Sequence, residues 1–277
     1  MKNTVVTFRA AKGQDKLVVL TAYDYSTARV MDDAGVNALL VGDSLGMVML
    51  GHEDTLGVSM DDMIRHCAAV ARAADQALVI CDMPYMSYHT SVDEAVRNAG
   101  RLVTEGRAQA VKLEGGSEFC DVVKALVRAS IPVMGHLGLT PQSVNAFGGF
   151  RMQGKTPSAA QKLLDDARAL QDAGAFALVL ECVPAPLAER VTQALAIPVI
   201  GIGAGAGCDG QVLVWQDMTG MTLSHLPRFV KRFGEVGASL RSAVEAYTRE
   251  VRAGAFPTED QCYPLPEGME KTLKKLK

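Results

Sequence analysis

The sequence predicts an α/β chain folded as a (β/α)8 TIM barrel, a single domain over residues 1–277 with an N-terminal extension and a C-terminal tail. Its 277 residues match the ~250 that eight β/α repeats usually need. Eight short apolar runs recur, most followed by a helical pattern, and such runs are typical of parallel strands buried on both faces. A doubly wound open sheet is the alternative fold. The predicted strands are 17–23, 38–42, 77–81, 109–113, 131–135, 176–180, 197–203 and 211–215.

The segments between these runs carry signals for helix starts. Residues 59–73 place apolar side chains at helical spacing on one face. Ser91 and Glu94 form an S-x-x-E capping box, and Thr156 precedes Pro157, a good first helical residue. These signals predict helices between the strands, as a barrel requires.

Two segments between strands are irregular, and two further segments follow the last strand. Residues 137–155 are Gly-rich and too long for a simple turn, so we expect a mobile flap over an active site. Residues 204–210, between the last two strands, are too short for a full helix. A long final helix is predicted over 227–253, and the Pro-containing tail after Gly254 is predicted to lie over the surface.

The composition argues against several classes of function. Lys and Arg number 28 and Asp and Glu 31, so a net charge of −3 gives no electrostatic reason to expect nucleic acid or an anionic membrane as partner. No uncharged apolar run approaches the ~20 residues of a membrane helix, and the first residues lack the apolar core of a signal peptide. We therefore expect a cytoplasmic protein.

Several short motifs carry little weight. The six cysteines form no C-x-x-C pair, so we expect reduced thiols rather than a structural zinc site. GIGAGAG (201–207) contains G-x-G-x-x-A, but no helix with an acidic residue follows at the spacing of a dinucleotide site. No G-x-S-x-G elbow supports an esterase nucleophile.

The informative pattern is positional. Active sites of such barrels lie at the carboxyl ends of the strands, and here five consecutive predicted strands end in an ionisable residue. A carboxylate is costly to bury unless it is paired, binds a metal or works in catalysis. These five residues are therefore the predicted site: Asp43, Asp82, Glu114, His136 and Glu181.

Three of the five offer only hard oxygen ligands. Asp43, Asp82 and Glu114 favour Mg²⁺, with Mn²⁺ as a substitute, over zinc. Lys112 stands two residues before Glu114, so both side chains point to the same side of the strand. Lys112 then either holds a substrate carboxylate or pairs with one of the acids, and the two roles are compatible.

At these residues the chain resembles the ketopantoate hydroxymethyltransferase family. The similar segments run through nearly the whole predicted barrel, which is more specific than any short motif. The family usually has Pro where Gly57 and Ala206 stand, and neither position touches a proposed ligand. The segments are LTAYDYSTARVMDDAGVNALLVGDSLGMVMLGHEDTL (20–56), CDMPYMSY (81–88), AVKLEGG (110–116), PVMGHLGLTPQSVNAFGGFRMQGK (132–155), LVLECVP (178–184) and IPVIGIGAGAGCDGQVLVWQDMTGM (197–221).

The resemblance implies a transferase of pantothenate and coenzyme A biosynthesis. It would move a hydroxymethyl group from 5,10-methylenetetrahydrofolate to 3-methyl-2-oxobutanoate, a 2-oxo acid, through a Mg²⁺-stabilised enolate, giving 2-dehydropantoate and tetrahydrofolate. The resemblance also implies a homo-oligomer, a decamer of two stacked pentamers. By position, Asp43 and Asp82 would bind Mg²⁺, and Glu114 would complete the metal site directly or through water.

The same resemblance assigns the remaining residues. Ser44 and Lys112 would hold the oxo acid, with His136 beside it, and Glu181 would be the general base that removes the C3 proton. With the two metal-binding aspartates, the substrate-binding set is Asp43, Ser44, Asp82, Lys112 and His136. The alternative for Glu181 is a plain ion pair with Lys112 or another cation.

Two other functions remain open from the residues alone. A lyase or mutase of the phosphoenolpyruvate mutase and isocitrate lyase type also holds a 2-oxo acid on Mg²⁺, but its lyases place a reactive Cys in a mobile loop. Residues 137–155 contain no Cys, which counts against this reading. A non-catalytic barrel is the other possibility, and it should have lost some of the strand-end acids, none of which is missing.

Overall fold

The computed structural model describes residues 2–222 and 226–276, and within them eight parallel strands form a closed barrel in chain order. β1 closes the barrel against β8, with Leu17 opposite Gly210 and Leu20 opposite Leu213. This pairing leaves no open sheet edge, so the barrel prediction is confirmed over the doubly wound alternative. The strands are β1 (Leu17–Thr21), β2 (Ala38–Val41), β3 (Leu78–Asp82), β4 (Ala110–Glu114), β5 (Val133–Gly138), β6 (Ala177–Glu181), β7 (Val199–Ile202) and β8 (Gly210–Leu213).

Helices surround the strands, and the core has two layers. One apolar cluster lies inside the barrel, and a larger one lies between the strands and the helices. Alternation along each strand divides the side chains between these layers. The helices are α1 (Val5–Ala10), α2 (Tyr25–Asp33), α3 (Leu45–Val48), α4 (Met60–Ala73), α5 (Val92–Thr104), η1 (Ser117–Phe119), α6 (Cys120–Arg128), η2 (Pro141–Ser143), α7 (Val144–Phe147), α8 (Pro157–Asp172), α9 (Ala185–Ala194), α10 (Trp215–Met218), α11 (Val236–Arg252), η3 (Glu259–Gln261) and α12 (Glu270–Leu273).

The predicted helix starts are largely confirmed. Thr156 caps α8 by accepting a hydrogen bond from the Ala159 N–H. At α5, Ser91 Oγ accepts from the Glu94 N–H, but the predicted capping box is only half formed. The Glu94 carboxylate accepts from the Thr90 hydroxyl instead of from the Ser91 backbone. The Thr90 hydroxyl therefore takes the place of the Ser91 backbone N–H as donor to the Glu94 carboxylate.

The N-terminal helix α1 closes the amino end of the barrel. The Phe8 side chain is 1% exposed and belongs to the inner cluster. Its ring meets Phe176 edge to face, with 5.9 Å between centroids. Lys12, just after α1, forms a 2.8 Å ion pair with Asp209, the residue before β8. The N-terminal extension is thus a plug built into the core.

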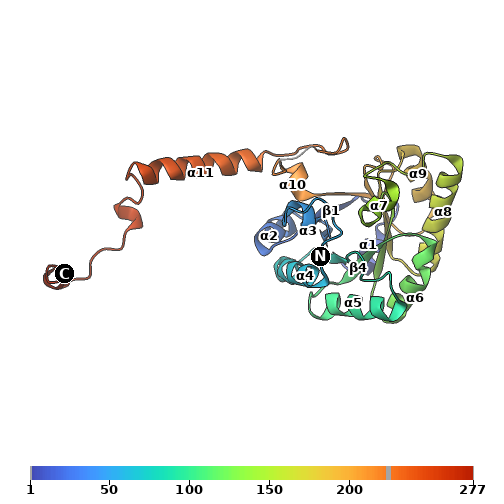
Figure 1. The fold of residues 1–277 in the computed structure, drawn as a ribbon, viewed down its shortest axis with the longest axis horizontal. Helices are drawn as coiled ribbons and strands as arrows, with labels where there is room; N and C mark the ends of the chain where they lie inside the picture. The colour runs from blue at the N-terminus through green and yellow to red at the C-terminus, as the bar shows by residue number, and fades with distance from the viewer. Residues whose placement is uncertain (1, 223–225, 277) are drawn as a thin grey trace.

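The C-terminal part departs most from prediction. Figure 1 shows α11 and the residues after it projecting away from the barrel, so the prediction that the tail after Gly254 lies over the surface is wrong. The last long helix spans Val236–Arg252, shorter than the predicted 227–253. Pro227 lacks an N–H and Gly234 is a poor helix former, so the segment before α11 stays irregular. The 204–210 connection contains no helix, as predicted.

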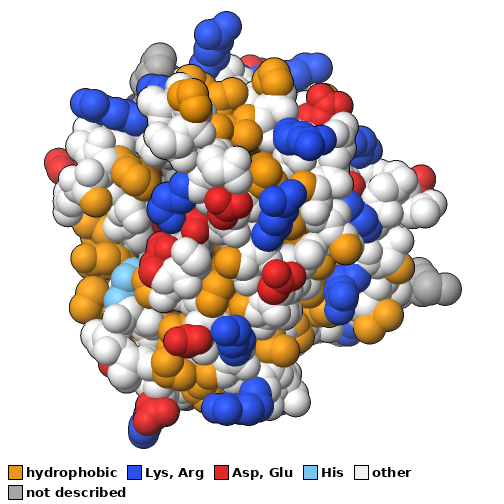
Figure 2. All heavy atoms as spheres, turned by 90° about the vertical axis from the view of Figure 1, so that its right-hand side faces the viewer, with side chains coloured by type: hydrophobic (Ala, Val, Ile, Leu, Met, Phe, Trp, Pro, Cys, Tyr) orange, Lys and Arg blue, Asp and Glu red, His pale blue; other side chains and the backbone are white. Residues whose placement is uncertain are grey.

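The outer surface of the barrel is mixed in character. Figure 2 views the side that carries α6, α8 and α9 in Figure 1, where acidic and basic side chains are interspersed with apolar ones. Among the described helices, none combines the length and apolar character needed to cross a lipid bilayer.

Candidate active site

The carboxyl ends of β2 to β6 bring the predicted ionisable residues to one end of the barrel. Asp43 follows β2 by two residues, Asp82 and Glu114 end β3 and β4, and His136 lies in β5. These four residues are at most 4% exposed, whereas the Glu181 side chain at the end of β6 is 16% exposed. Four buried groups and one solvent-reaching carboxylate therefore face one another at the mouth.

Lys112 stands among the acids as a buried cation. Strand register places it opposite Asp82, and Lys112 Nζ lies 3.0 Å from Asp82 Oδ1. Burial alone would lower the pKa of Lys112, but the charges of Asp82, Glu114 and Asp43 raise it above its ordinary value. The ammonium is charged at neutral pH, and Lys112 forms the ion pair with an acid that was one of its two predicted roles.

His136 connects the buried acids to Glu181. Its Nδ1 lies 3.3 Å from Glu114 Oε1 and 3.2 Å from Lys112 Nζ, while its Nε2 lies 3.3 Å from Glu181 Oε2. Burial and the Lys112 charge lower the pKa of His136. The ring is therefore neutral near pH 7 and lies between the two carboxylates.

Asp43 and Asp82 crowd negative charge into the barrel mouth. Burial, followed by the charges of Asp82 and Glu114, raises the pKa of Asp43 well above its ordinary value. Burial also raises the pKa of Asp82, and Lys112 offsets part of that rise. Asp82 Oδ2 accepts from the Asp43 N–H at 3.1 Å, and its buried Oδ1 lies 3.0 Å from Lys112 Nζ, a contact that uses one of its two lone pairs. This oxygen retains acceptor capacity for a cation.

The three acids do not form a ready-made three-ligand cage. Across residues 2–222 and 226–276, no three His, Cys, Asp or Glu side chains converge to hold a metal. Both Glu114 oxygens have other neighbours, because Oε2 accepts from the Gln142 N–H at 2.9 Å and Oε1 faces His136. Asp43 and Asp82 remain as two hard oxygen donors, a number that suits Mg²⁺ with water or substrate oxygens in its other positions.

Comparison with known proteins identifies the family. The family model described as ketopantoate hydroxymethyltransferase matches residues 2–259. The chain belongs to the ketopantoate hydroxymethyltransferase family. It is 58% identical to the 3-methyl-2-oxobutanoate hydroxymethyltransferase of Clostridium novyi (strain NT) over 97% of this chain and 98% of the relative. The protein of that name from Enterococcus faecalis (strain ATCC 700802 / V583) is 57% identical over 99% of this chain and 100% of its own length.

Solved structures with the same fold are more distant in sequence. A 2,3-dimethylmalate lyase of the PEP mutase/isocitrate lyase superfamily matches with a TM-score of 0.58 and 18% identity over 100% of both chains. A phosphoenolpyruvate phosphomutase from Streptomyces platensis subsp. rosaceus matches with a TM-score of 0.62 and 15% identity, over 99% of this chain and 98% of the other. These likenesses establish the fold, whereas the sequence relatives establish the ketopantoate hydroxymethyltransferase family.

Ser44 lies beside the acids in this family member, and its hydrogen-bond partner, Tyr23, was not predicted. Ser44 Oγ is 2.8 Å from the Tyr23 hydroxyl, and Tyr23 is fully buried. Burial raises the pKa of Tyr23, so the phenol keeps its proton. Tyr23 ends the first apolar run, and the strand-end rule that found Asp43 could have found it too.

Gln142 and Tyr88 were also missed. Gln142 Nε2 donates to Asp43 Oδ2 at 2.8 Å, and the Tyr88 hydroxyl donates to Gln142 Oε1 at 2.7 Å. Gln142 lies in the irregular 137–155 segment and Tyr88 six residues beyond Asp82, so strand-end position did not mark either. Only the folded chain brings these amide and phenol groups to the carboxylates.

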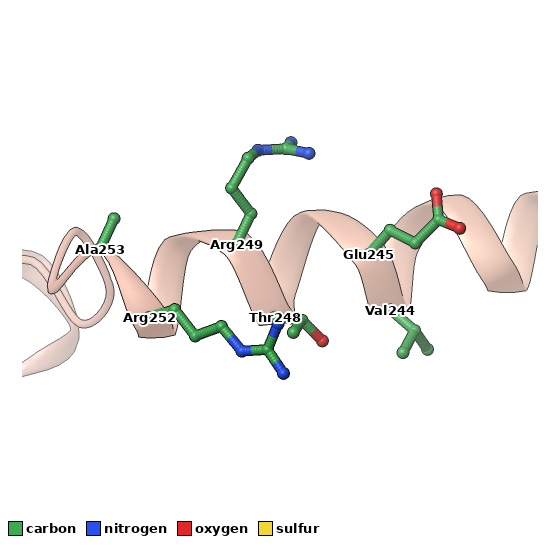
Figure 3. Close-up of a pocket in the computed structure, with 6 residues that line it drawn as sticks. All are labelled: Val244, Glu245, Thr248, Arg249, Arg252 and Ala253. Carbon is green, nitrogen blue, oxygen red and sulfur yellow. The ribbon is translucent and has the colours of Figure 1, made fainter.

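A hollow of about 590 Å³ lies far from this chemistry, on α11. Figure 3 shows its lining side chains spreading from a single helix, with no second element opposite them. It is the open side of an isolated helix rather than an enclosed pocket. The hollow is lined by Val244, Glu245, Thr248, Arg249, Arg252 and Ala253.

Proposed function

We propose that the chain transfers the one-carbon unit of 5,10-methylenetetrahydrofolate to 3-methyl-2-oxobutanoate at the mouth of the barrel. Its family membership gives a hydroxymethyltransferase that forms ketopantoate in pantothenate biosynthesis. The C3 carbon of the oxo acid gains a bond to the transferred carbon. Water supplies the oxygen of the new hydroxymethyl group, and tetrahydrofolate leaves. Residues 1–277 act as one catalytic domain in this proposal.

Mg²⁺ is the cation that the carboxylates fit. Asp43 and Asp82 would hold it, and Glu114 would act beyond them, because its oxygens already contact Gln142 and His136. The donor chemistry is hard oxygen, and Asp82 Oδ1 has a second lone pair beside its contact with Lys112. When bound, Mg²⁺ supplies a Lewis acid that stabilises negative charge developing on the 2-oxo oxygen.

Lys112 and Ser44 orient the oxo acid in this proposal. The Lys112 ammonium, now 3.0 Å from Asp82 Oδ1, can exchange part of that contact for the substrate carboxylate. The Ser44 hydroxyl, 2.8 Å from Tyr23, offers a neutral hydrogen bond close by. His136 packs beside the substrate and carries no charge of its own near pH 7.

The observation that carries the proposal is the position of Glu181. His136 stands between Glu181 and Glu114, so the one partly exposed carboxylate of the site is held apart from a buried one. A base there can accept the C3 proton without competing for the cation. Its contact is with His136 Nε2, and no ion pair with Lys112 is found in the described part of the chain.

The deciding experiment follows product formation with and without Mg²⁺. The protein is given 3-methyl-2-oxobutanoate and 5,10-methylenetetrahydrofolate, and 2-dehydropantoate is measured. Oxaloacetate-type and phosphonate substrates serve as controls for mutase or lyase chemistry. Mg²⁺-dependent 2-dehydropantoate supports the proposal, whereas turnover of a control substrate alone contradicts it. A rise in melting temperature with Mg²⁺ and oxo acid but no turnover would indicate a binding protein instead.

We also propose a homo-oligomer, a decamer by family resemblance, in the cytoplasm. α11 has no buried residue, and four apolar side chains at helical spacing form a stripe along it that is 44–59% exposed. An exposed stripe of this kind requires a covering surface. The barrel has an uncovered outer wall at β1 and β8, where Val18 is 49% exposed. The six free thiols fit a reducing compartment. The α11 stripe consists of Leu240, Val244, Tyr247 and Val251.

A further inference from the structure

Gln142 occupies the centre of a hydrogen-bond network at the barrel mouth. Its side chain lies in η2 and is 5% exposed. Nε2 donates to Asp43 Oδ2 at 2.8 Å and to the Met83 carbonyl at 2.9 Å, and Oε1 accepts from the Tyr88 hydroxyl at 2.7 Å. The Gln142 backbone N–H donates to Glu114 Oε2 at 2.9 Å. One residue therefore contacts groups that follow or end β2, β3 and β4.

These partners fix the orientation of the amide. The Asp43 carboxylate, when ionised, and the Met83 carbonyl can only accept hydrogen bonds, so the NH₂ group must face them. Both amide hydrogens are then used, and Oε1 is left for the Tyr88 hydroxyl. A rotated amide would place Oε1 against two acceptors. The side chain is thus locked in one arrangement.

The locked amide determines how Asp43 is presented. Oδ2 of Asp43 is occupied by the Gln142 donor, which leaves Oδ1 for a cation. Gln142 is neutral, so it orients the carboxylate without adding positive charge that would repel the cation. Lys112, by contrast, places a full charge against Asp82. Groups that orient metal ligands in this way commonly change metal affinity 10- to 100-fold when removed.

The same residue lies within the Gly-rich segment 137–155, just before residues 144–155. η2 leads directly into α7 and then to Gly148 and Gly149, both of which have positive φ. The side chain of Gln142 is tied to Asp43, and its backbone is tied to Glu114. The start of residues 144–155 is therefore anchored to the acids of the mouth.

We propose that Gln142 is a positioning residue that orients Asp43 and Glu114 for a divalent cation and links occupation of that site to the conformation of residues 144–155. This inference rests on the proposed function, because the cation belongs to that reaction. It assigns a new role to a side chain that need not touch substrate. We therefore expect a substitution at Gln142 to lower the affinity for the cation before it lowers the rate of the chemical step.

The test is calorimetric titration of the full-length protein with Mg²⁺ alone. Gln142→Met keeps the chain length but removes both donors and the acceptor. The matched control is Gln216→Met, because Gln216 is also 5% exposed but its amide contacts Met49 Sδ rather than a carboxylate. We expect the Mg²⁺ Kd to rise roughly 10- to 100-fold in Gln142→Met and to stay at the wild-type value in Gln216→Met.

A second readout follows the segment itself. Hydrogen exchange of residues 144–155 should slow when Mg²⁺ saturates the wild-type protein, and the slowing should be lost in Gln142→Met at the same Mg²⁺ concentration. In turnover, Gln142→Met should need more Mg²⁺ for half-maximal rate and recover most of its kcat at high Mg²⁺. Gln142→Glu preserves the shape of the side chain, so it provides a second folded variant, and the added carboxylate near Asp43 should change the Mg²⁺ Kd.

The outcomes separate this inference from the proposed function. A wild-type Mg²⁺ Kd in both Gln142 variants, with product formation still Mg²⁺-dependent, overturns the inference and leaves the function standing. A lower melting temperature with an unchanged Kd overturns it too, since that is what a purely structural glutamine would give. A wild-type protein that forms product without any divalent cation overturns the metal proposal and the inference together.

Discussion

His136 Nε2 lies 3.3 Å from Glu181 Oε2, while the other nitrogen of the same ring faces Glu114. The imidazole thus spans the distance between a buried carboxylate and a partly exposed one. Since the pKa of His136 is lowered by burial and by Lys112, the ring separates the two acids without neutralising either. Two carboxylates in one site can therefore hold different roles, one deep and one facing incoming substrate.

The role of Glu181 can be measured by isotope exchange. If Glu181 is the base, the protein with Mg²⁺ should exchange the C3 hydrogen of 3-methyl-2-oxobutanoate with D₂O even without folate. Glu181→Gln keeps the size but cannot accept the proton, so exchange and turnover should fall roughly 10²–10⁴-fold while the oxo acid still binds. NMR follows the exchange. Exchange at the original rate with reduced turnover would place the base elsewhere and Glu181 on the folate side.

Asp43 and Asp82 are each expected to be necessary for the cation. Asp43→Ala and Asp82→Ala should fold but lose Mg²⁺-dependent binding of the oxo acid, because each removes one of two hard oxygen ligands. Calorimetry with Mg²⁺ and oxo acid measures the loss. Asp33→Ala is the control, since that side chain is 61% exposed on α2. Unchanged Mg²⁺-dependent binding in both site variants would refute the assignment.

The apolar stripe of α11 should hold subunits together. Light scattering should give a mass well above that of a dimer at micromolar concentration. The double variant Leu240→Glu, Val244→Glu should form smaller species, because each substitution puts a charge into the apolar contact between subunits. Arg249 points away from Val244 in Figure 3, so Arg249→Ala is the control. A wild-type monomer would contradict the proposed assembly.

The crowded acids should make the metal-free protein less stable as pH rises. The pKa values of Asp43 and Asp82 are raised, mainly by burial, so the folded chain binds more protons than the unfolded chain between about pH 4 and the raised values. The free energy of unfolding therefore decreases with pH across that window. Asp43→Asn removes one of these groups and should flatten the slope.

Urea denaturation in EDTA at several pH values measures this slope. Saturating Mg²⁺ should flatten it as well, because a bound cation favours the deprotonated carboxylates. A slope that is the same for wild type and Asp43→Asn would mean that Asp43 titrates alike in the folded and unfolded chains.

Asp32 provides a purely structural contrast. Its buried carboxylate accepts backbone N–H groups of Asp75 at 2.9 Å, Gln76 at 3.1 Å and Ala77 at 2.7 Å, which ties α2 to the start of β3. Asp32→Ala leaves these donors unpaired and should lower the free energy of unfolding by about 2–4 kcal/mol. The kcat of the folded fraction should stay at the wild-type value. A large loss of kcat without loss of stability would be the contrary result.

Strand order and strand ends could be predicted because their causes are local. The run 77–81 is apolar and bounded by polar residues, which marks it as a strand. The observed β3 is shifted from this predicted range by only one residue. The position of Asp82 at a strand end follows directly from that run. The same reasoning placed Asp43, Glu114, His136 and Glu181 at one mouth, since parallel strands share their carboxyl end.

Other features depend on contacts between distant segments. The amide of Gln142 reaches Asp43 across 99 residues of chain, and no local pattern encodes that hydrogen bond. The position of α11 also escaped prediction. Its amphipathic pattern correctly indicates a helix, but the pattern does not state which surface covers the apolar side.

The plug formed by Phe8 and α1 should also affect the order in which ligands bind. With the amino end sealed, ligands have one entrance, at the end of the barrel that carries the carboxylates. Lys112 and the aspartates lie deeper than the partly exposed Glu181. Because the barrel has this one opening, we expect the small oxo acid to bind first and 5,10-methylenetetrahydrofolate to bind after it and cover it, with release in the reverse order. Steady-state patterns should therefore show compulsory-order binding, with 3-methyl-2-oxobutanoate as the leading substrate.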